Sequence, residues 1–280
     1  MKRSDICLYT AICSEVSSAE EIIGYAEKLS VGGVELMNFC RELKQPDMAE
    51  ARRLGAMARE RSLKIPCFSA AVDFLTKPDA VQTLQGYAQI CSELEIPYLH
   101  HTIAKDFTVW DLSDREREDR FQRCLEAALD LCDYARSLGV RTLIEDQGFV
   151  FNGAENCLRL CGLSDEKIGI VADVGNCLFV DEQPEDFIRA AGKRICHAHL
   201  KDYLVTGEPH PQRKSYRTKG GKYLTDALIG EGSIDYAAVM EAFRRVNYQG
   251  MYALECPGIR TIEEANRILD RITVGEDGYT

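Results

Sequence analysis

The chain has 280 residues, of which 45% are hydrophobic and 28% charged, and its formal net charge is −11. This length suits one α/β barrel domain, and the negative charge argues against nucleic acid as a partner. The 12 cysteines are scattered without a C-x-x-C pair, so we expect reduced thiols and no zinc or redox motif of that kind.

The first residues read MKRSDICLYTAIC, with a short apolar run and no small-residue cleavage site after it. This pattern favours neither a signal peptide nor a membrane span. We therefore expect a cytoplasmic protein that does not insert into membranes.

Short apolar runs rich in β-branched or aromatic residues alternate with longer amphipathic stretches along the chain. Eight such units predict an α/β fold, a single-domain (β/α)8 TIM barrel over residues 1–280. The candidate strands are Asp5–Ala11, Gly33–Met37, Ile65–Ala70, Tyr98–Ile103, Thr142–Asp146, Gly169–Asp173, Ile195–Leu200 and Met251–Glu255.

The clearest helix is expected from Asp114 to Leu138, because apolar residues recur on one face of it. That face consists of Phe121, Cys124, Leu125, Ala128, Leu131, Cys132 and Ala135. Helix starts are also indicated by polar or proline-containing pairs near residues 18, 47 and 79.

One long irregular stretch is expected between about Asp202 and Ser233, after the seventh strand. Loops of this length in compact domains are usually functional or disordered, and in a barrel this one would lie over the C-terminal mouth. Two interpretations remain open, a lid over the active site and a solvated insertion.

Acidic residues end three of the apolar strands, at Glu145, Asp173 and Glu255, and the seventh strand contributes His199. A carboxylate buried there is unfavourable unless it is paired or binds a metal. The intervals between these four residues along the chain correspond to about one βα unit each, and only the last interval is longer, because it includes the 202–233 stretch. The four side chains should therefore meet at one rim of the barrel. We therefore predict one divalent metal ion held by these four residues.

Three carboxylates and one imidazole form an oxygen-rich set of ligands. Such a set suits Mn²⁺ or Mg²⁺ better than a thiolate-rich zinc site does, and it leaves positions for substrate oxygens. Co²⁺ or Zn²⁺ could also occupy it.

These residues resemble the sugar phosphate isomerase/epimerase family of the xylose isomerase-like TIM barrel superfamily, which includes ketose 3-epimerases and inosose dehydratases. The resemblance covers nearly the whole chain and rests on segments 33–36, 144–146, 171–176, 197–202, 230–236 and 247–255. It implies that Glu145, Asp173, His199 and Glu255 are the metal ligands. It also implies that Glu145 and Glu255 are acid and base on opposite faces of a bound sugar.

The family often has a histidine three residues after the sixth-strand aspartate, where this chain has Asn176. Asparagine can bond a substrate hydroxyl but cannot carry a proton. The resemblance also points to Glu35, which would orient substrate or a neighbouring side chain or form a buried structural pair. His197 faces the same way as His199 and is either a substrate contact or a core histidine.

Two further substrate contacts are considered. His100 and His101 end the fourth strand, only one of them can face inward, and we favour His101. Residues 201–222 are rich in cations, and Arg217 among them would close over an anionic group of the substrate. A solvated charged surface is the other interpretation of this stretch.

The implied activity is metal-dependent isomerisation or epimerisation of a carbohydrate, with proton transfer through a metal-stabilised enediolate. Dehydration or another lyase reaction on the same barrel is the alternative. A non-catalytic sugar-binding or partner barrel is a further alternative, which Asn176 keeps open. The endonuclease IV type of barrel is disfavoured, since the chain has only 5 histidines. Such barrels often pair through their helices, so a homo-oligomer is also considered.

Overall fold

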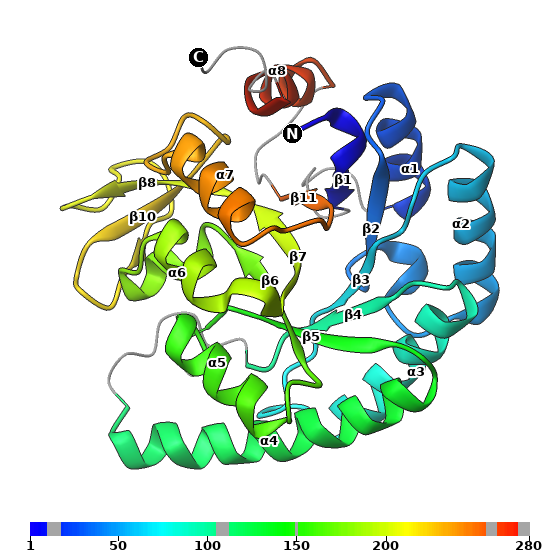
Figure 1. Cartoon of the computed structure of the whole chain (residues 1–280), viewed down its shortest axis with the longest axis horizontal. Helices are drawn as coiled ribbons and strands as arrows, with labels where there is room; N and C mark the ends of the chain where they lie inside the picture. Colours follow the sequence, from blue (N-terminus) through cyan, green and yellow to red (C-terminus); the bar gives the residue numbers. More distant parts are fainter. Residues whose placement is uncertain (10–17, 105–111, 149–150, 256–261, 274–280) are drawn as a thin grey trace.

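The computed structural model describes residues 1–9, 18–104, 112–148, 151–255 and 262–273. Eight parallel strands close into a barrel in the order β1, β11, β7, β6, β5, β4, β3, β2 (Figure 1). The strands are β1 (Ile6–Tyr9), β2 (Gly33–Met37), β3 (Cys67–Ala70), β4 (Tyr98–His101), β5 (Arg141–Glu145), β6 (Gly169–Asp173), β7 (Ile195–Leu200) and β11 (Tyr252–Leu254). The predicted single-domain (β/α)8 barrel is confirmed.

Helices surround the barrel and cover its outer face (Figure 1). They are α1 (Ala19–Lys28), α2 (Met48–Glu60), α3 (Ala80–Glu93), α4 (Asp114–Ser137), α5 (Ala154–Leu163), α6 (Pro184–Ala191), α7 (Tyr236–Arg245) and α8 (Ile262–Thr273). The buried residues of α4 are those of the predicted apolar face, and Ser113 caps its first turn through Glu116. Among the described residues, none of the helices is long and apolar enough to cross a membrane.

Three strand predictions, at 33–37, 169–173 and 195–200, agree with the structure residue for residue. The other predicted strands differ from the observed ones by one or two residues at their ends, where periodicity constrains a strand least. Residues 10 and 11 of the first prediction lie outside the described residues.

The barrel register brings the C-terminal ends of neighbouring strands to one rim. Asp173 pairs with His199 between β6 and β7, and Ala253 pairs with His199 between β11 and β7. Tyr9 pairs with Glu35 between β1 and β2. Because side chains alternate between the two faces of a strand, residues in register on the inner face converge inside the barrel.

The expectation of an irregular stretch at 202–233 is wrong. This segment contains β8 (Asp202–Thr206), β9 (Tyr216–Arg217) and β10 (Tyr223–Ala227), which form an antiparallel sheet in the order β8, β10, β9. Its apolar face packs on the 3-10 helix η3 (Asn176–Val180), with Phe179 against Tyr203 and Tyr216. Aromatic and β-branched residues such as Tyr203, Val205 and Tyr223 favour strands here, although the segment also contains many glycines and charged residues.

Asp202, which is fully buried, closes this inserted sheet at its base. Its carboxylate accepts hydrogen bonds from the backbone N–H groups of Tyr203, Gly230, Gly232 and Ile234, at 2.8 to 3.3 Å. A Cβ atom at Gly232 would lie 2.0 Å from Oδ1 of Asp202, so only glycine allows this close approach. The two ends of the insertion are therefore joined by one side chain.

Candidate metal centre

The side chains of Glu145, Asp173, His199 and Glu255 meet at the C-terminal end of the barrel. Each offers one ligand atom, and these atoms all lie within 4.8 Å of one another. Nδ1 of His199 lies 3.2 Å from Oε1 of Glu145 and 3.2 Å from Oε2 of Glu255. The four residues are thus brought together as the sequence predicts, while their role as ligands stays a prediction.

Two buried atoms of this cluster make no regular hydrogen bond among the described residues. They are Nδ1 of His199 and Oδ2 of Asp173, which lies 2.8 Å from the ammonium of Lys201. Buried polar atoms are nearly always paired, so an imidazole nitrogen and a carboxylate oxygen without a regular hydrogen bond are available to a metal ion. The other carboxylate oxygen of Asp173 is fixed by the backbone N–H groups of Gly175 and Asn176. Buried carboxylates and an imidazole with open coordination atoms suit a divalent cation.

Glu35 lies on the barrel axis side of this cluster and is fully buried. Its carboxylate accepts hydrogen bonds from Nε2 of His199 at 3.2 Å, from Nε2 of His197 at 2.7 Å and from the hydroxyl of Ser69. Burial raises the pKa of Glu35, but the imidazoles of His199 and His197 hold it well below its usual range. Glu35 is therefore an ionised acceptor that fixes both histidine rings.

The orientation of His199 follows from these contacts. Its Nε2 carries the proton donated to Glu35, so Nδ1 is the nitrogen that faces Glu145 and Glu255. Burial lowers the pKa of His199, but the carboxylates of Glu35, Glu145 and Glu255 raise it well above its ordinary value. These carboxylates therefore favour the protonated ring in the metal-free protein, and a metal ion at Nδ1 would replace that proton.

His100, and not His101, faces the cluster. Nε2 of His100 lies 3.6 Å from Oε2 of Glu145, and its Nδ1 is 2.7 Å from Oγ of Ser69. Since the Ser69 hydroxyl donates to Glu35, it accepts the Nδ1 proton of His100, which leaves Nε2 as an acceptor. His101 is turned away by strand alternation and contacts the ring of Phe74, so our preference for His101 was wrong.

Lys201 was missed by the sequence analysis. It is 5% exposed, and its ammonium lies 2.8 Å from Oδ2 of Asp173 and 2.9 Å from Oε1 of Glu255. Burial lowers the pKa of Lys201, but the charges of Asp173 and Glu255 raise it well above its usual value. The period-two pattern from His197 and His199 continues to position 201 and would have identified this inward lysine.

The two glutamates of the cluster are in different electrostatic environments. Burial, with a contribution from the charge of Asp173, raises the pKa of Glu145 to about 7. Burial also raises the pKa of Glu255, but Lys201 and His199 lower it to about 2. One carboxyl can therefore exchange a proton near neutral pH, and the other stays ionised.

The remaining predicted site residues lie at two places. Asn176 is buried beside the cluster, with its side-chain oxygen 3.4 Å from the ammonium of Lys201. Its side-chain nitrogen has no hydrogen-bond partner among the described residues. Arg217 lies on β9 of the inserted sheet and is exposed. The substrate-binding roles of both residues stay predictions.

Comparison with known proteins agrees with this architecture. Residues 23–272 match the family described as xylose isomerase-like TIM barrel. The D-psicose 3-epimerase of Enterocloster bolteae is 27% identical over 153 residues, which cover 54% of this chain and 43% of that protein. The inosose dehydratase of Lacticaseibacillus casei is 25% identical over 156 residues, covering 54% and 51%. The chain thus spans about half the length of the curated relatives it matches.

Solved structures share the fold at low sequence identity. A D-psicose 3-epimerase from Clostridium cellulolyticum H10, solved with D-tagatose, superposes with a TM-score of 0.71 at 15% identity, covering 99% of this chain and 93% of that one. The IolI protein, solved with a bound zinc atom, gives 0.73 at 18% identity, covering 98% and 97%. These similarities establish the barrel, and the relatives on it are epimerases and dehydratases.

Proposed function

Because this chain belongs to the xylose isomerase-like TIM barrel family, we propose that it is a divalent-metal-dependent isomerase or epimerase of a sugar or sugar derivative. The observation that carries this proposal is the convergence of Glu145, Asp173, His199 and Glu255 within 4.8 Å. The epimerases and dehydratases among its relatives support the same class of proton chemistry.

In this proposal the four residues hold one divalent metal ion, with Mn²⁺ or Mg²⁺ preferred and Co²⁺ or Zn²⁺ also compatible. When bound, the ion supplies Lewis acidity toward the carbonyl and hydroxyl oxygens of the sugar. Glu35 fixes His199 for this task, since its hydrogen bond to Nε2 leaves Nδ1 free to coordinate.

Glu145 and Glu255 are the proposed proton-transfer groups. A carboxyl group can accept and return a proton, as a general acid or base requires. In the metal-free protein burial raises the pKa of Glu145 to about 7. Glu255, with its pKa near 2, begins as an ionised base. Transfer to the opposite face of the same carbon gives epimerisation, and transfer to the neighbouring carbon gives isomerisation.

Three polar side chains beside the cluster are proposed to bind substrate oxygens. The unprotonated Nε2 of His100 can accept a hydrogen bond from a sugar hydroxyl, and the partnerless amide nitrogen of Asn176 can donate one. Lys201 can donate to a carbonyl or hydroxyl oxygen while it contacts Glu255. Together they would orient the reacting carbon between the carboxylates.

The inserted sheet is the proposed cover of the substrate, with Arg217 as a contact to an anionic group. Asp226 on β10 lies near enough to Lys201 for the two charges to interact. Burial raises the pKa of Asp226, and the positive charges of Lys201 and Lys214 offset part of this rise. In this proposal the sheet borders the cluster and acts as a fixed wall of the substrate site.

A dehydratase is the second candidate, favoured by one specific feature. The Lys201 ammonium lies beside the cluster and can protonate a departing hydroxyl group, a need that simple epimerisation does not have. The inosose dehydratases among the relatives are consistent with this alternative.

The test is to incubate the metal-loaded protein in deuterated water with ketoses, inososes and keto-glycosides. We expect metal-dependent exchange of a carbon-bound proton with deuterium, detected by NMR and mass spectrometry. The variant Glu145→Gln should lose exchange while still folding. An epimerised or isomerised product of unchanged composition supports the first proposal, and a product lighter by one water supports the dehydratase.

A metal-loaded protein that exchanges no carbon-bound proton of any of these substrates would overturn both proposals. The non-catalytic barrel would then be favoured if the protein still bound one of the sugars.

A further inference from the structure

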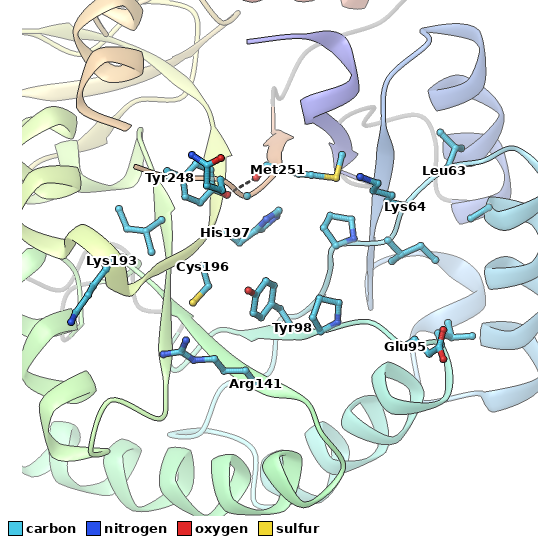
Figure 2. Close-up of a pocket in the computed structure, with 18 of the residues that line it drawn as sticks. Leu63, Lys64, Glu95, Tyr98, Arg141, Lys193, Cys196, His197, Tyr248 and Met251 are labelled. Carbon is cyan, nitrogen blue, oxygen red and sulfur yellow. Dashed lines mark hydrogen bonds between the residues drawn. The ribbon is translucent and has the colours of Figure 1, made fainter. Parts of the chain in front are cut away.

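A cavity opens at the end of the barrel opposite the candidate metal centre, where the strands begin. Its volume is about 860 Å³, and it is formed by segments that precede β3, β4, β7 and β11 (Figure 2). None of the four clustered residues at the C-terminal end lines it. This end of a TIM barrel normally contributes to stability, so a cavity of this size there calls for an explanation.

The cavity combines apolar walls with a few polar groups. Leu63, Leu94, Val246 and Met251 supply apolar surface, and Lys64, Tyr98, Arg141 and His197 supply polar atoms. In Figure 2 Lys64 lies beside Met251 on one side of the cavity, Tyr98 and Arg141 lie on the other side, and His197 lies near the middle. The lining is thus mixed in polarity, and the volume falls within the range of roughly 300 to 1,000 Å³ that is typical of small-molecule sites.

The charge of this cavity is opposite to that of the chain. Four cationic residues line it, Arg59, Lys64, Arg141 and Lys193, against the one carboxylate of Glu95, whereas the whole chain carries −11. Within the described part of the chain, neither Arg59 nor Lys64 forms an ion pair with a carboxylate. The local excess of positive charge favours an anion.

Arg141 is held in place for such a contact. Its Nε donates to the carbonyl oxygen of Lys167 at 3.1 Å, and one terminal nitrogen donates to that of Glu166 at 3.0 Å. Both acceptors are neutral backbone groups, so the guanidinium keeps its charge and its remaining donors. A fixed arginine loses little conformational entropy when it binds an oxyanion.

The floor of the cavity is connected to the candidate metal centre. His197, only 1% exposed, lines the cavity and donates through Nε2 to one oxygen of Glu35, while His199 donates to the other. A ligand in contact with the His197 ring would thus lie two hydrogen bonds from His199.

We propose that this cavity is a second binding site, for a small molecule that carries a phosphate or carboxylate group on a partly apolar body. Lys64 and Arg141, which lie on opposite sides of the cavity, each offer a contact for an anionic group (Figure 2). Tyr98 can donate a further hydrogen bond, and the body contacts Leu63 and Met251. This site is independent of the proposed catalytic function and would exist in a non-catalytic barrel as well.

The experiment measures binding of inorganic phosphate, citrate, glucose 6-phosphate and glucose by calorimetry, with a chelator present to keep phosphate from metal ions. Histidine side-chain NMR signals are followed in parallel. We expect the three anions to bind and neutral glucose not to bind. The signal of His197 should move as anion is added, and that of His210, in the inserted sheet, should not.

Substitutions locate the site. Lys64→Met should weaken anion binding about tenfold or more, because one charge-assisted contact is lost. The matched control Lys44→Met changes a lysine outside the cavity and should leave binding unchanged. The proposal is overturned if no anion binds, or if Arg217→Ala abolishes binding while Lys64→Met does not, since the anion would then occupy the opposite end of the barrel.

Discussion

Oε1 of Glu35 lies 3.2 Å from Nε2 of His199, on the side of the imidazole ring that faces away from Glu145 and Glu255. This single contact determines which nitrogen of His199 faces the other three candidate ligands. It also connects β2 to β7 through the interior of the barrel. Glu35 lies on β2, which contributes none of the four predicted ligands, and it thereby fixes the ring of His199.

Glu35→Gln should weaken binding of a divalent metal ion about 10- to 100-fold, as loss of the carboxylate behind a metal-bound histidine typically does. Calorimetry with Mn²⁺ measures this directly. The control Glu182→Gln changes a half-buried glutamate that accepts from the backbone of Ala154, far from the cluster. Equal affinities in both variants would show that Glu35 does not orient His199.

His199→Ala should abolish metal binding, because the imidazole and its Nδ1 atom are lost from the centre of the cluster. The metal content of the dialysed protein, measured by elemental analysis, should fall from about one ion per chain to almost none. His210→Ala removes a histidine of the inserted sheet and should keep the ion. A wild-type protein that retains no divalent metal after loading would contradict the proposed centre.

Lys201→Met should destabilise the metal-free protein by about 3–5 kcal/mol, because Asp173 and Glu255 would lose the buried cation between them. A divalent metal ion should restore much of this stability, since it supplies positive charge to the same carboxylates. Urea unfolding with and without metal measures both effects. Lys167→Met removes an exposed pair with Asp133 and should change stability by less than about 1 kcal/mol.

The metal-free protein should lose stability as the pH rises toward 8. The pKa of Glu145 is raised from 4.5 to about 7, so the folded state holds this proton more tightly than the unfolded state does. A raised pKa contributes stability that is complete below the unfolded value and is lost as the pH passes the folded value. Between about pH 5.5 and about pH 8 we expect a loss of roughly 2 kcal/mol.

Thermal unfolding in the presence of a chelator checks this pH dependence. Glu145→Gln cannot ionise and should give a flatter profile over the same range. An identical slope in the variant and the wild type would show that another group is responsible.

Arg217→Ala and Lys214→Ala should raise the Michaelis constant for an anionic substrate and leave the turnover number nearly unchanged, because these cations would bind substrate without touching the reacting carbon. Steady-state kinetics on the substrate found by deuterium exchange provides the test, with Lys44→Met as the control. Unchanged Michaelis constants would remove the inserted sheet from the substrate site.

The sequence predicts the barrel and its cluster well because both depend on strand periodicity. Glu145 and Asp173 end apolar strands, and the C-terminal ends of parallel strands must share a rim. The convergence of these two side chains with those of His199 and Glu255 is therefore predictable from the pattern of strands alone.

The choice between His100 and His101 needed more than periodicity. Strand alternation allows either histidine to face inward. Only the register with β3, which pairs Ser69 with His100, shows that His100 is the inward one. The inserted sheet was missed because its strands are held by packing on Phe179, a contact remote in sequence. Its signal was the aromatic and β-branched residues at 203–206 and 223–225, separated by a stretch that contains Gly220 and Gly221.

Asp202 gathers backbone N–H groups from both ends of the insertion, so the entrance and exit of this segment are held together by its own first residue. Lengthening a segment whose ends are already fixed adds little entropic penalty, about 0.6 kcal/mol for each doubling. The length of the chain between residues 203 and 230 can therefore change at small entropic cost while Asp202 keeps the two ends together. We expect insertions between β8 and β9 to leave the strands that carry the carboxylates as they are.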